Sequence, residues 1–301
     1  TLRFVVYSII CMKVIVNPAA GRGRGSKQIP RLRKLLKERR IEHELLITRE
    51  RGHATELAKQ LVESGVKRVI VAGGDGTISE VVNGLAGTSV EIGIVSFGTG
   101  NDIARTLNLP YNDVARALDV AVAGRVRDID LGMERGRFFV SGAGLGFAAD
   151  VVEQSRRATW LRGPAAFFYA VHRVLHRLRV IEVLLEINGQ AREVECVAVL
   201  VQNTAYTGGG LLIAPRAMID DGLLDVVIIG PIGRLDLVWN FPRLYRGTHT
   251  DHPKFALFRA SKVRIETAVP LPKMMDGDIW GASPLEAEVA SQAVKVVVDH
   301  E

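Results

Sequence analysis

Short apolar runs alternate with longer amphipathic stretches over the first part of the chain. Four runs read as buried strands, at residues 13–16, 44–47, 68–72 and 92–95. Between and after them, apolar residues recur at helical spacing, at residues 27–40, 53–64, 77–85, 102–107 and 113–123. Strands and helices that alternate at this spacing predict βαβ units around a parallel sheet.

The pattern changes after Arg135, where apolar runs recur with turn residues between them. These runs span residues 137–141, 181–187, 193–201, 223–229, 263–267 and 293–298. Asn188 and Gly189 lie between two of the runs, and Asn-Gly is a strong signal for a two-residue hairpin. Two helical patterns, at residues 161–178 and 235–245, interrupt this region. The second part is therefore predicted to be an antiparallel β-sandwich with helical insertions.

The two patterns predict two domains. Residues 12–135 are expected to form a Rossmann-like α/β domain, and residues 136–289 a β-sandwich. The final segment, 290–301, can pack back onto the first domain. A chain of 301 residues with 48% hydrophobic composition is large enough for two cores. The active site is expected in the cleft between the domains.

Charge and cysteine content narrow the function classes only slightly. The formal net charge is +6, which favours polyanions such as nucleic acid, an anionic membrane or nucleotide phosphates. Cys11 and Cys196 lie far apart and form no CxxC motif, which fits a reducing, cytosolic setting. No run reaches the ~20 apolar residues of a membrane span. Residues before Met12 are interpreted as an extension, and membrane contact is expected to be peripheral.

Glycine-rich turns follow three of the predicted strands. They are NPAAG from Asn17, GGDGT from Gly73 and GTGND from Gly98. Adjacent glycines let the backbone approach a phosphate, and the helix that follows offers free N–H groups. The alternative for a single turn of this kind is a tight turn with a helix cap. Three such turns on successive strand ends indicate a ligand site at one edge of the sheet.

With these and further motifs, the chain resembles the bacterial diacylglycerol kinase and lipid kinase family, which shares its catalytic domain with sphingosine and ceramide kinases. The matching segments, in order, are NPAAG from Asn17, GGDGT from Gly73, Glu80 with VVNG, GTGNDIAR from Gly98, Asp128 and Asp130, TGGG from Thr207, IAP from Ile213, DDGLLDVVII from Asp220 and MDGD from Met275. The resemblance covers nearly the whole chain from Met12. This resemblance implies an ATP- and Mg²⁺-dependent lipid kinase in which the domain of residues 136–289 binds the lipid.

The resemblance assigns an ATP site to the turns and their neighbours. By position, that site comprises Asn17, Thr48, Gly73, Gly74, Asp75, Gly76, Thr77, Glu80, Gly98, Thr99, Asn101 and Asp102. It further implies a water-linked acidic network of Asp75, Asp102 and Asp130 that places Mg²⁺ near the phosphates. Hard oxygen donors of this kind suit Mg²⁺.

A second, mainly structural metal site is implied at Asp221 with the backbone carbonyls of Met218 and Leu223. Asp276 matches the aspartate taken as general base, which accepts the proton of the lipid hydroxyl as it attacks the γ-phosphate. For Asp276-Gly277 alone, an ordinary Asp-Gly turn is the alternative.

Three residues depart from the family pattern, which usually has Pro at Ser96, Asn at Ser141 and Glu at Asp278. The first two are expected to be tolerated loop and strand changes. Asp278 is one methylene shorter than the usual residue. The division of work between Asp276 and Asp278 therefore stays open.

Two segments are candidates for membrane contact. Residues 156–180 contain six arginines and no acidic residue, with Trp160, Phe167, Phe168 and Tyr169 between them. Residues 235–245 carry Trp239, Phe241 and Tyr245. A basic, aromatic helix can lie at an anionic interface, whereas the alternative is core packing with a solvated basic face.

Other readings remain open on the sequence. A soluble kinase related to NAD kinase or phosphofructokinase also uses a GGDG turn, and a non-catalytic nucleotide-binding regulator is allowed by Asp278. Nucleic-acid binding ranks last, because no known module for it is present. Diacylglycerol is the favoured acceptor, at the cytoplasmic face of the inner membrane. Edge strands of the second domain allow a homodimer.

Overall fold

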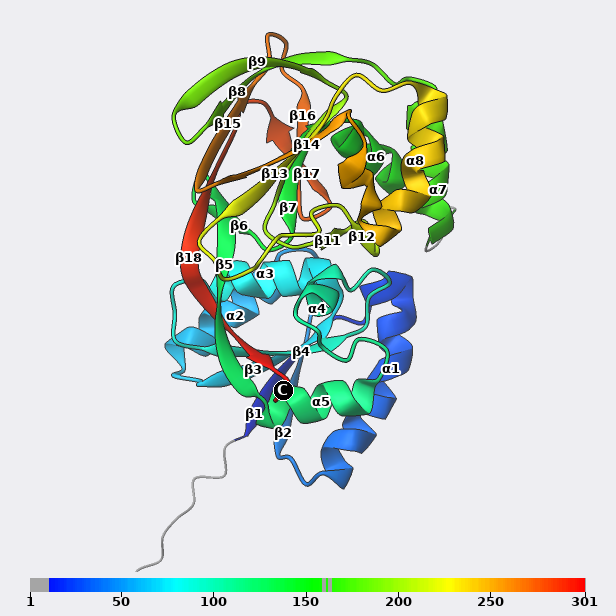
Figure 1. Ribbon diagram of the computed structural model, residues 1–301. Coiled ribbons are helices and arrows are strands. Elements are labelled where there is room, and N and C mark those ends of the chain that lie inside the picture. The colour runs from blue at the N-terminus through cyan, green and yellow to red at the C-terminus, as the bar shows by residue number, and fades with distance from the viewer. Residues whose placement is uncertain (1–10, 159–160, 162–163, 301) are drawn as a thin grey trace, which may run out of the picture.

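Four parallel strands form the centre of the first lobe, in the order β2, β1, β3, β4 (Figure 1). The computed structural model describes residues 11–158, 161 and 164–300. The strands are β1 (Met12–Val16), β2 (His43–Ile47), β3 (Arg68–Gly73) and β4 (Glu91–Ser96). Consecutive residues of β1, β3 and β4 are buried, as strands covered on both faces require. The predicted parallel sheet is confirmed.

Helices cover both faces of this sheet. On one face lie α2 (His53–Glu63) and α3 (Asp75–Leu85), which pack against Ile92 of β4. On the other lie α1 (Ala20–Glu38) and α5 (Val114–Ala123), which pack against Ile70 of β3. The short helix α4 (Asp102–Thr106) follows β4. The first helix was expected to begin at Lys27 but begins at Ala20, with left-handed backbone at residues 21–23.

The second lobe is a sandwich of two sheets. The first is a six-stranded antiparallel sheet in the order β14, β13, β10, β7, β16, β17, and the second consists of β18, β15, β8 and β9. Leu145, Val199 and Val226 of the first meet Leu185 and Ile265 of the second in one core. The strands of these two sheets are β7 (Gly142–Gly146), β8 (Ile181–Ile187), β9 (Gln190–Cys196), β10 (Ala198–Gln202), β13 (Leu224–Ile229), β14 (Phe255–Ala260), β15 (Lys262–Glu266), β16 (Pro272–Met275), β17 (Asp278–Ala282) and β18 (Leu285–Val298).

Three helices cover the outer face of the six-stranded sheet. They are α6 (Phe147–Arg157), α7 (Pro164–Leu175) and α8 (Arg234–Arg246), followed by a 3₁₀ turn at Thr248–Asp251. Leu237 and Leu244 of α8 pack there against Leu200 and Val227. The helical patterns predicted at 161–178 and 235–245 are thus present as α7 and α8. A further helix that was not predicted, α6, precedes them. Trp160 and residues 1–10 lie outside the described residues.

Two long strands join the lobes (Figure 1). β18 (Leu285–Val298) pairs with β15 in the second lobe and, at Lys295 and Val296, runs parallel to β4 in the first. β5 (Arg125–Glu134) lies antiparallel along β18 and also pairs with β6 (Arg137–Phe139). One continuous ten-stranded sheet therefore passes from the first lobe into the second.

Several strands differ from the sequence prediction. The apolar run at 193–201 was predicted as one strand but forms β9 and β10 in different sheets, with Val197 between them. The β7 strand was not predicted because its sequence is GAGLG. Glycine is required there by close packing: a Cβ at Gly144 would lie 2.7 Å from the Val199 carbonyl oxygen. The two small strands β11 (Tyr206–Thr207) and β12 (Leu211–Leu212) were also missed.

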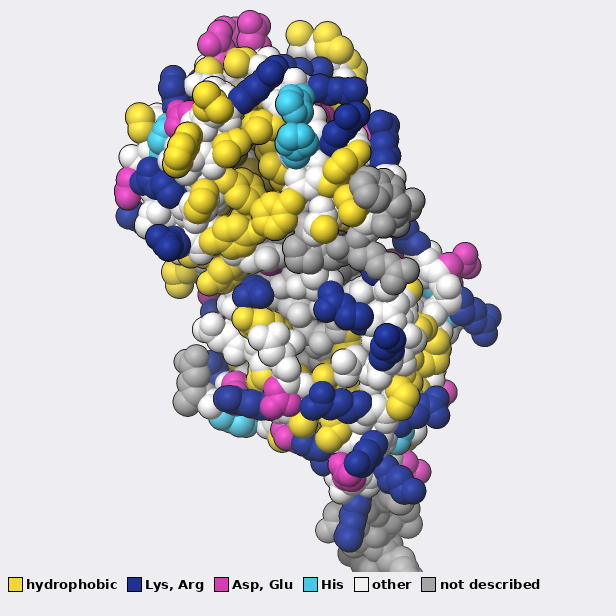
Figure 2. Space-filling model, turned by 90° about the vertical axis from the view of Figure 1, so that its right-hand side faces the viewer, with side chains coloured by type: hydrophobic (Ala, Val, Ile, Leu, Met, Phe, Trp, Pro, Cys, Tyr) yellow, Lys and Arg dark blue, Asp and Glu magenta, His cyan; other side chains and the backbone are white. Residues whose placement is uncertain are grey.

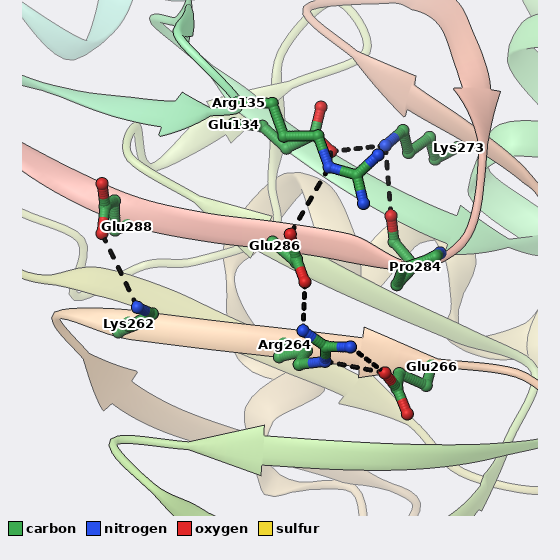
Figure 3. Close-up of polar contacts among 9 residues, drawn as sticks. All are labelled: Glu134, Arg135, Lys262, Arg264, Glu266, Lys273, Pro284, Glu286 and Glu288. Carbon is green, nitrogen blue, oxygen red and sulfur yellow. Dashed lines mark hydrogen bonds and ion pairs between the residues drawn. The ribbon is translucent and has the colours of Figure 1, made fainter.

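Ion pairs connect the strands of the second lobe (Figure 3). Near the surface, Arg135 lies in the turn between β5 and β6, and its Nε is 3.4 Å from Oε2 of Glu286 in β18. Inside the lobe, the ammonium of Lys273 in β16 contacts Glu134 of β5 and donates to the Pro284 carbonyl at 3.1 Å. Both members of the Lys273–Glu134 pair are buried, at 6% and 7% exposure of their side chains. This pair ties the two sheets of the sandwich together.

Candidate active site

Glycine-rich turns meet at one edge of the parallel sheet. Gly73 ends β3, and Gly98 follows β4. A Cβ added to Gly98 would lie 2.9 Å from the Cα of Gly74, so the two turns touch and only glycine fits there. Asn17, which follows β1, donates to Thr77 Oγ1 at 2.8 Å. The three turns lie together, as the carboxyl ends of neighbouring parallel strands should.

The larger of two cavities beside these turns has a volume of about 740 Å³. Its wall includes Asn17, Thr48, Gly74, Gly76, Thr77 and Glu80, which are all residues expected to bind ATP. Arg51, Arg137 and Arg156 complete the wall together with Trp280. The Arg137 guanidinium lies 3.5 Å from the centre of the Trp280 ring. A wall with several guanidinium groups suits a chain of phosphates.

A second cavity, of about 390 Å³, has a more apolar wall. Phe167, Phe168, Tyr245 and Met274 of the second lobe line it, opposite polar residues of the turns, which are Asp75, Thr99 and Asp102. Asp276 lines both cavities. Its carboxylate therefore lies at the boundary between a cavity with several arginines in its wall and a more apolar one.

Asp276 occupies the first position of the two-residue turn between β16 and β17. The turn is an ordinary hairpin turn with φ +46°, but the side chain points inward. Its Oδ2 accepts hydrogen bonds from the Ser79 hydroxyl at 2.6 Å and the Val140 N–H at 2.9 Å. Its Oδ1 accepts from the N–H groups of Ser141 and Gly142 at 2.8 and 3.2 Å. Burial raises the pKa of Asp276, and these hydrogen bonds oppose that rise.

Asp75 and Asp102 lie next to each other at the starts of α3 and α4. Asp75 Oδ1 accepts from the Ile103 N–H at 3.2 Å, and Asp102 accepts from the N–H groups of Gly209 and Gly210 at 2.8 and 2.7 Å. Asp102 therefore ties the first lobe to the glycine loop of the second. Burial and the neighbouring charge of Asp102 raise the pKa of Asp75 to about 7, and burial also raises the pKa of Asp102.

Asp75→Asn is expected to stabilise the ligand-free protein above pH 7 and to leave its stability near pH 4 unchanged. The carboxyl ionises near 3.8 in the unfolded chain and at about 7 in the folded one. The native protein therefore binds the proton more tightly when folded, and it loses stability as the pH rises through this window. Because the cavity admits solvent, the gain at pH 8 should be roughly 1–3 kcal/mol.

Urea unfolding of both proteins from pH 4 to pH 8 measures this effect. Asp299→Asn, at the far end of the chain, is the control for loss of one carboxylate and should show the native pH dependence. The same pH dependence in native protein and Asp75→Asn would rule out a raised pKa at Asp75.

Asp278 lies in the wall of the larger cavity and has different partners from Asp276. Its carboxylate contacts Arg51 of the first lobe and Arg156 of α6, the latter at 2.7 Å. The shorter Asp side chain, where the family usually has Glu, still reaches both arginines. Asp278 therefore holds two cationic side chains across the cleft. The other departures lie close by, Ser96 at the end of β4 and Ser141 in the wall of the smaller cavity.

The residues expected at the second metal site lie away from both cavities. Asp130 accepts from the N–H groups of Gly222 and Gln292 at 2.6 and 2.7 Å, which places it against the loop that contains Asp221 rather than beside Asp75. The buried Asp221 Oδ2 forms an ion pair with Arg259 and has no hydrogen-bond donor among the described residues. A cationic side chain therefore lies beside the carboxylate that was expected to bind the second metal ion.

Several cavity residues were missed in the sequence. Ser79 and Arg137 belong to an ordinary helix and an ordinary strand, so nothing marked them. Arg156 was included in the segment named as a candidate for membrane contact, and its place in the wall of the larger cavity was not predicted. It lies in the last turn of α6, which faces the cleft. Its neighbour Arg157 pairs with Glu153 of the same helix.

Known proteins share this two-lobe arrangement and the sequence that forms it. A model of the diacylglycerol kinase catalytic domain matches residues 11–133, and one of the YegS C-terminal NAD kinase beta sandwich-like domain matches residues 141–298. A diacylglycerol kinase of Mycobacterium tuberculosis is 33% identical over 284 residues, which cover 92% of this chain and 91% of that protein. The chain belongs to the diacylglycerol kinase family.

Other relatives agree with this membership. A diacylglycerol kinase of Bacillus subtilis is 30% identical over 293 residues, which cover 96% of both proteins. The crystal structure of a diacylglycerol kinase from Bacillus anthracis covers 96% of this chain with a TM-score of 0.77 and 26% identity. The resemblance found in the sequence and the two-domain fold are thus confirmed. Membership in the diacylglycerol kinase family identifies a kinase and supports a role on lipids.

Proposed function

We propose that this chain transfers the γ-phosphoryl group of ATP, with Mg²⁺, to the hydroxyl of a membrane lipid, with diacylglycerol as the first candidate. One observation carries the proposal: Asp276 lines both the arginine-walled cavity and the apolar one. Phosphoryl transfer needs a donor and an acceptor in line on the two sides of one group. The nucleotide is assigned to the larger cavity and the glycerolipid to the smaller one.

The nucleotide would be held by the turns and the arginines. Thr48, Gly74 and Thr77 lie in the wall of the larger cavity, and glycine at position 74 allows close approach of the phosphates. Arg51 and Arg156 form ion pairs with Asp278 in the wall of this cavity, and their guanidinium groups can pair with phosphate oxygens. In this assignment Asp278 is a positioning residue rather than the base.

Asp75 and Asp102 fit a divalent cation. They are neighbouring hard-oxygen donors in one cavity wall. Burial, together with the neighbouring charge of Asp102, raises the pKa of Asp75 to about 7, so a cation beside both carboxylates would stabilise their ionised forms. Magnesium bound with the nucleotide supplies charge neutralisation at the phosphates. Cation binding would favour the ionised form of Asp75.

Asp276 is assigned the proton of the acceptor hydroxyl. A carboxylate whose pKa is raised by burial holds a proton more readily than an exposed one. The Ser79 hydroxyl and three backbone N–H groups fix the orientation of the carboxylate at the boundary of the two cavities. As the hydroxyl oxygen attacks the γ-phosphorus, its proton passes to an oxygen of Asp276.

Transfer of ³²P from labelled ATP to a panel of lipid vesicles, with and without Mg²⁺, tests the proposal. Mg²⁺-dependent labelling of one lipid is expected, with diacylglycerol the strongest acceptor. Labelling of a soluble acceptor instead would support a kinase of the NAD kinase or phosphofructokinase type. ATP binding without transfer to any acceptor would support a non-catalytic regulator.

A further inference from the structure

Helix α8 is apolar on its solvent face as well as on its buried face. Leu237 and Leu244 pack into the second lobe. Leu235, Val238 and Trp239 lie on the opposite side at spacings of three and four residues, with exposures of 78%, 50% and 81%. We call these three side chains the α8 surface. An amphipathic surface helix normally presents polar residues there, so this surface indicates a binding partner.

Apolar side chains continue from α8 to the mouth of the smaller cavity. Phe168 of α7 is 48% exposed, and its ring centre lies 6.1 Å from that of Phe241 on α8. The Phe241 ring in turn lies 6.0 Å from Tyr245. Phe168 and Tyr245 line the smaller cavity. Figure 2 shows apolar side chains gathered on this face of the second lobe.

Basic side chains lie around this apolar area (Figure 2). Arg234 and Arg246 are exposed at the two ends of α8, and Arg173 of α7 and Arg177, which follows that helix, are exposed as well. The acidic Asp236 on α8 accepts a hydrogen bond from Asn240 and lies 3.4 Å from His252. An apolar centre with a basic margin matches an anionic bilayer, in which tryptophan sits at the headgroup level and arginine pairs with lipid phosphates.

We propose that the α8 surface inserts into the headgroup region of an anionic bilayer and so brings the mouth of the smaller cavity to its lipid. This inference deepens the proposed function and rests on the acceptor being a lipid. It also accounts for the aromatic side chains of α7 and α8 in the wall of this cavity, which are Phe167, Phe168 and Tyr245. A lipid can then pass from the bilayer to Asp276 along apolar side chains.

Flotation with vesicles tests the α8 surface without any turnover. Native protein, Leu235→Ser/Val238→Ser/Trp239→Ser and the control Leu184→Ser/Val269→Ser are mixed, without ATP, with phosphatidylcholine vesicles that contain phosphatidylglycerol. The control residues are exposed apolar side chains elsewhere on the second lobe. Because all the substituted side chains are exposed, both variants should fold normally. The triple variant should bind at least about tenfold more weakly than native protein, and the control should bind like native protein.

A second assay separates this inference from the proposed function. With dioctanoylglycerol in solution as acceptor, the triple variant should keep native activity, while its activity on vesicle-borne diacylglycerol should fall about tenfold. Vesicle binding by the triple variant equal to native binding would overturn the inference. A native dimer that the triple variant converts to monomer, with vesicle binding unchanged, would assign the α8 surface to a second copy of the chain. Vesicle binding by α8 with no transfer to any acceptor would refute the proposed function alone.

Discussion

Asp276→Asn is expected to lower phosphoryl transfer about 10³-fold while ATP binding stays close to native. The substitution keeps the size of the side chain but removes its ability to accept a proton. The four hydrogen-bond donors around Asp276, which are the Ser79 hydroxyl and the backbone N–H groups of Val140, Ser141 and Gly142, would meet one carbonyl oxygen and one amide nitrogen instead. The donors that face the amide nitrogen would lose their acceptor, so the variant should also be less stable. Because Asp276 is assigned the proton of the acceptor hydroxyl and no contact with ATP, the lost activity should appear in kcat rather than in nucleotide affinity.

Two further substitutions sharpen this prediction. Asp278→Asn should weaken ATP binding and lower transfer less than Asp276→Asn, because Asp278 positions Arg51 and Arg156. Asp299→Asn, far from the cavities, should have native activity. Single-turnover transfer and ATP titration of the three variants give the comparison. A larger loss in Asp278→Asn than in Asp276→Asn would assign the base to Asp278.

Lys273→Met is expected to destabilise the second lobe by about 3–5 kcal/mol. Lys273 and Glu134 form a buried ion pair between the two sheets of the sandwich. Removal of the ammonium leaves the Glu134 carboxylate buried, and the cationic partner that remains among the described residues is Arg135, whose Nε lies 3.8 Å away. The midpoint of urea unfolding, followed by circular dichroism, should fall accordingly.

Removing the Glu134 carboxylate together with the Lys273 ammonium should recover most of the lost stability. Lys273→Met/Glu134→Leu removes both charges and leaves apolar side chains in the core, which is often close to neutral. Lys262→Met removes a cation from the exposed pair with Glu288, whose closest atoms lie 4.0 Å apart, and should cost less than about 1 kcal/mol (Figure 3). A double variant as unstable as Lys273→Met would show that Lys273 acts through packing or through its bond to Pro284.

Much of the fold follows from local sequence patterns. The strands at 68–72 and 92–95 are continuous apolar runs, and only a strand covered on both faces requires that pattern. The hairpin at Asn188-Gly189 was predicted because a two-residue turn with left-handed φ requires such residues, and β8 pairs with β9 there. β5 was missed because three of its first four residues, Arg125, Arg127 and Asp128, are charged, so no apolar run marks its start.

The candidate site also contains some residues that the sequence indicates and others that only the fold brings together. The glycines at 73, 74 and 98 are visible in the sequence because a turn pressed against another turn tolerates no Cβ. The arginines of the larger cavity are not visible, since Arg51, Arg137 and Arg156 come from three separate segments that meet only after folding. The place of Arg156 in this wall could therefore not be predicted from its own segment.

The sequence by itself determined the alternation of elements, the glycine turns at the strand ends and the family, because these depend on residues close together along the chain. Tertiary contacts were needed to show that β18 runs from the second lobe into the sheet of the first, and that Asp276 lies between an arginine-lined cavity and a more apolar one. The tertiary structure also decided which face of α8 is exposed. Both faces of that helix are apolar, so periodicity could not distinguish them, and burial depends on neighbours far away in the chain.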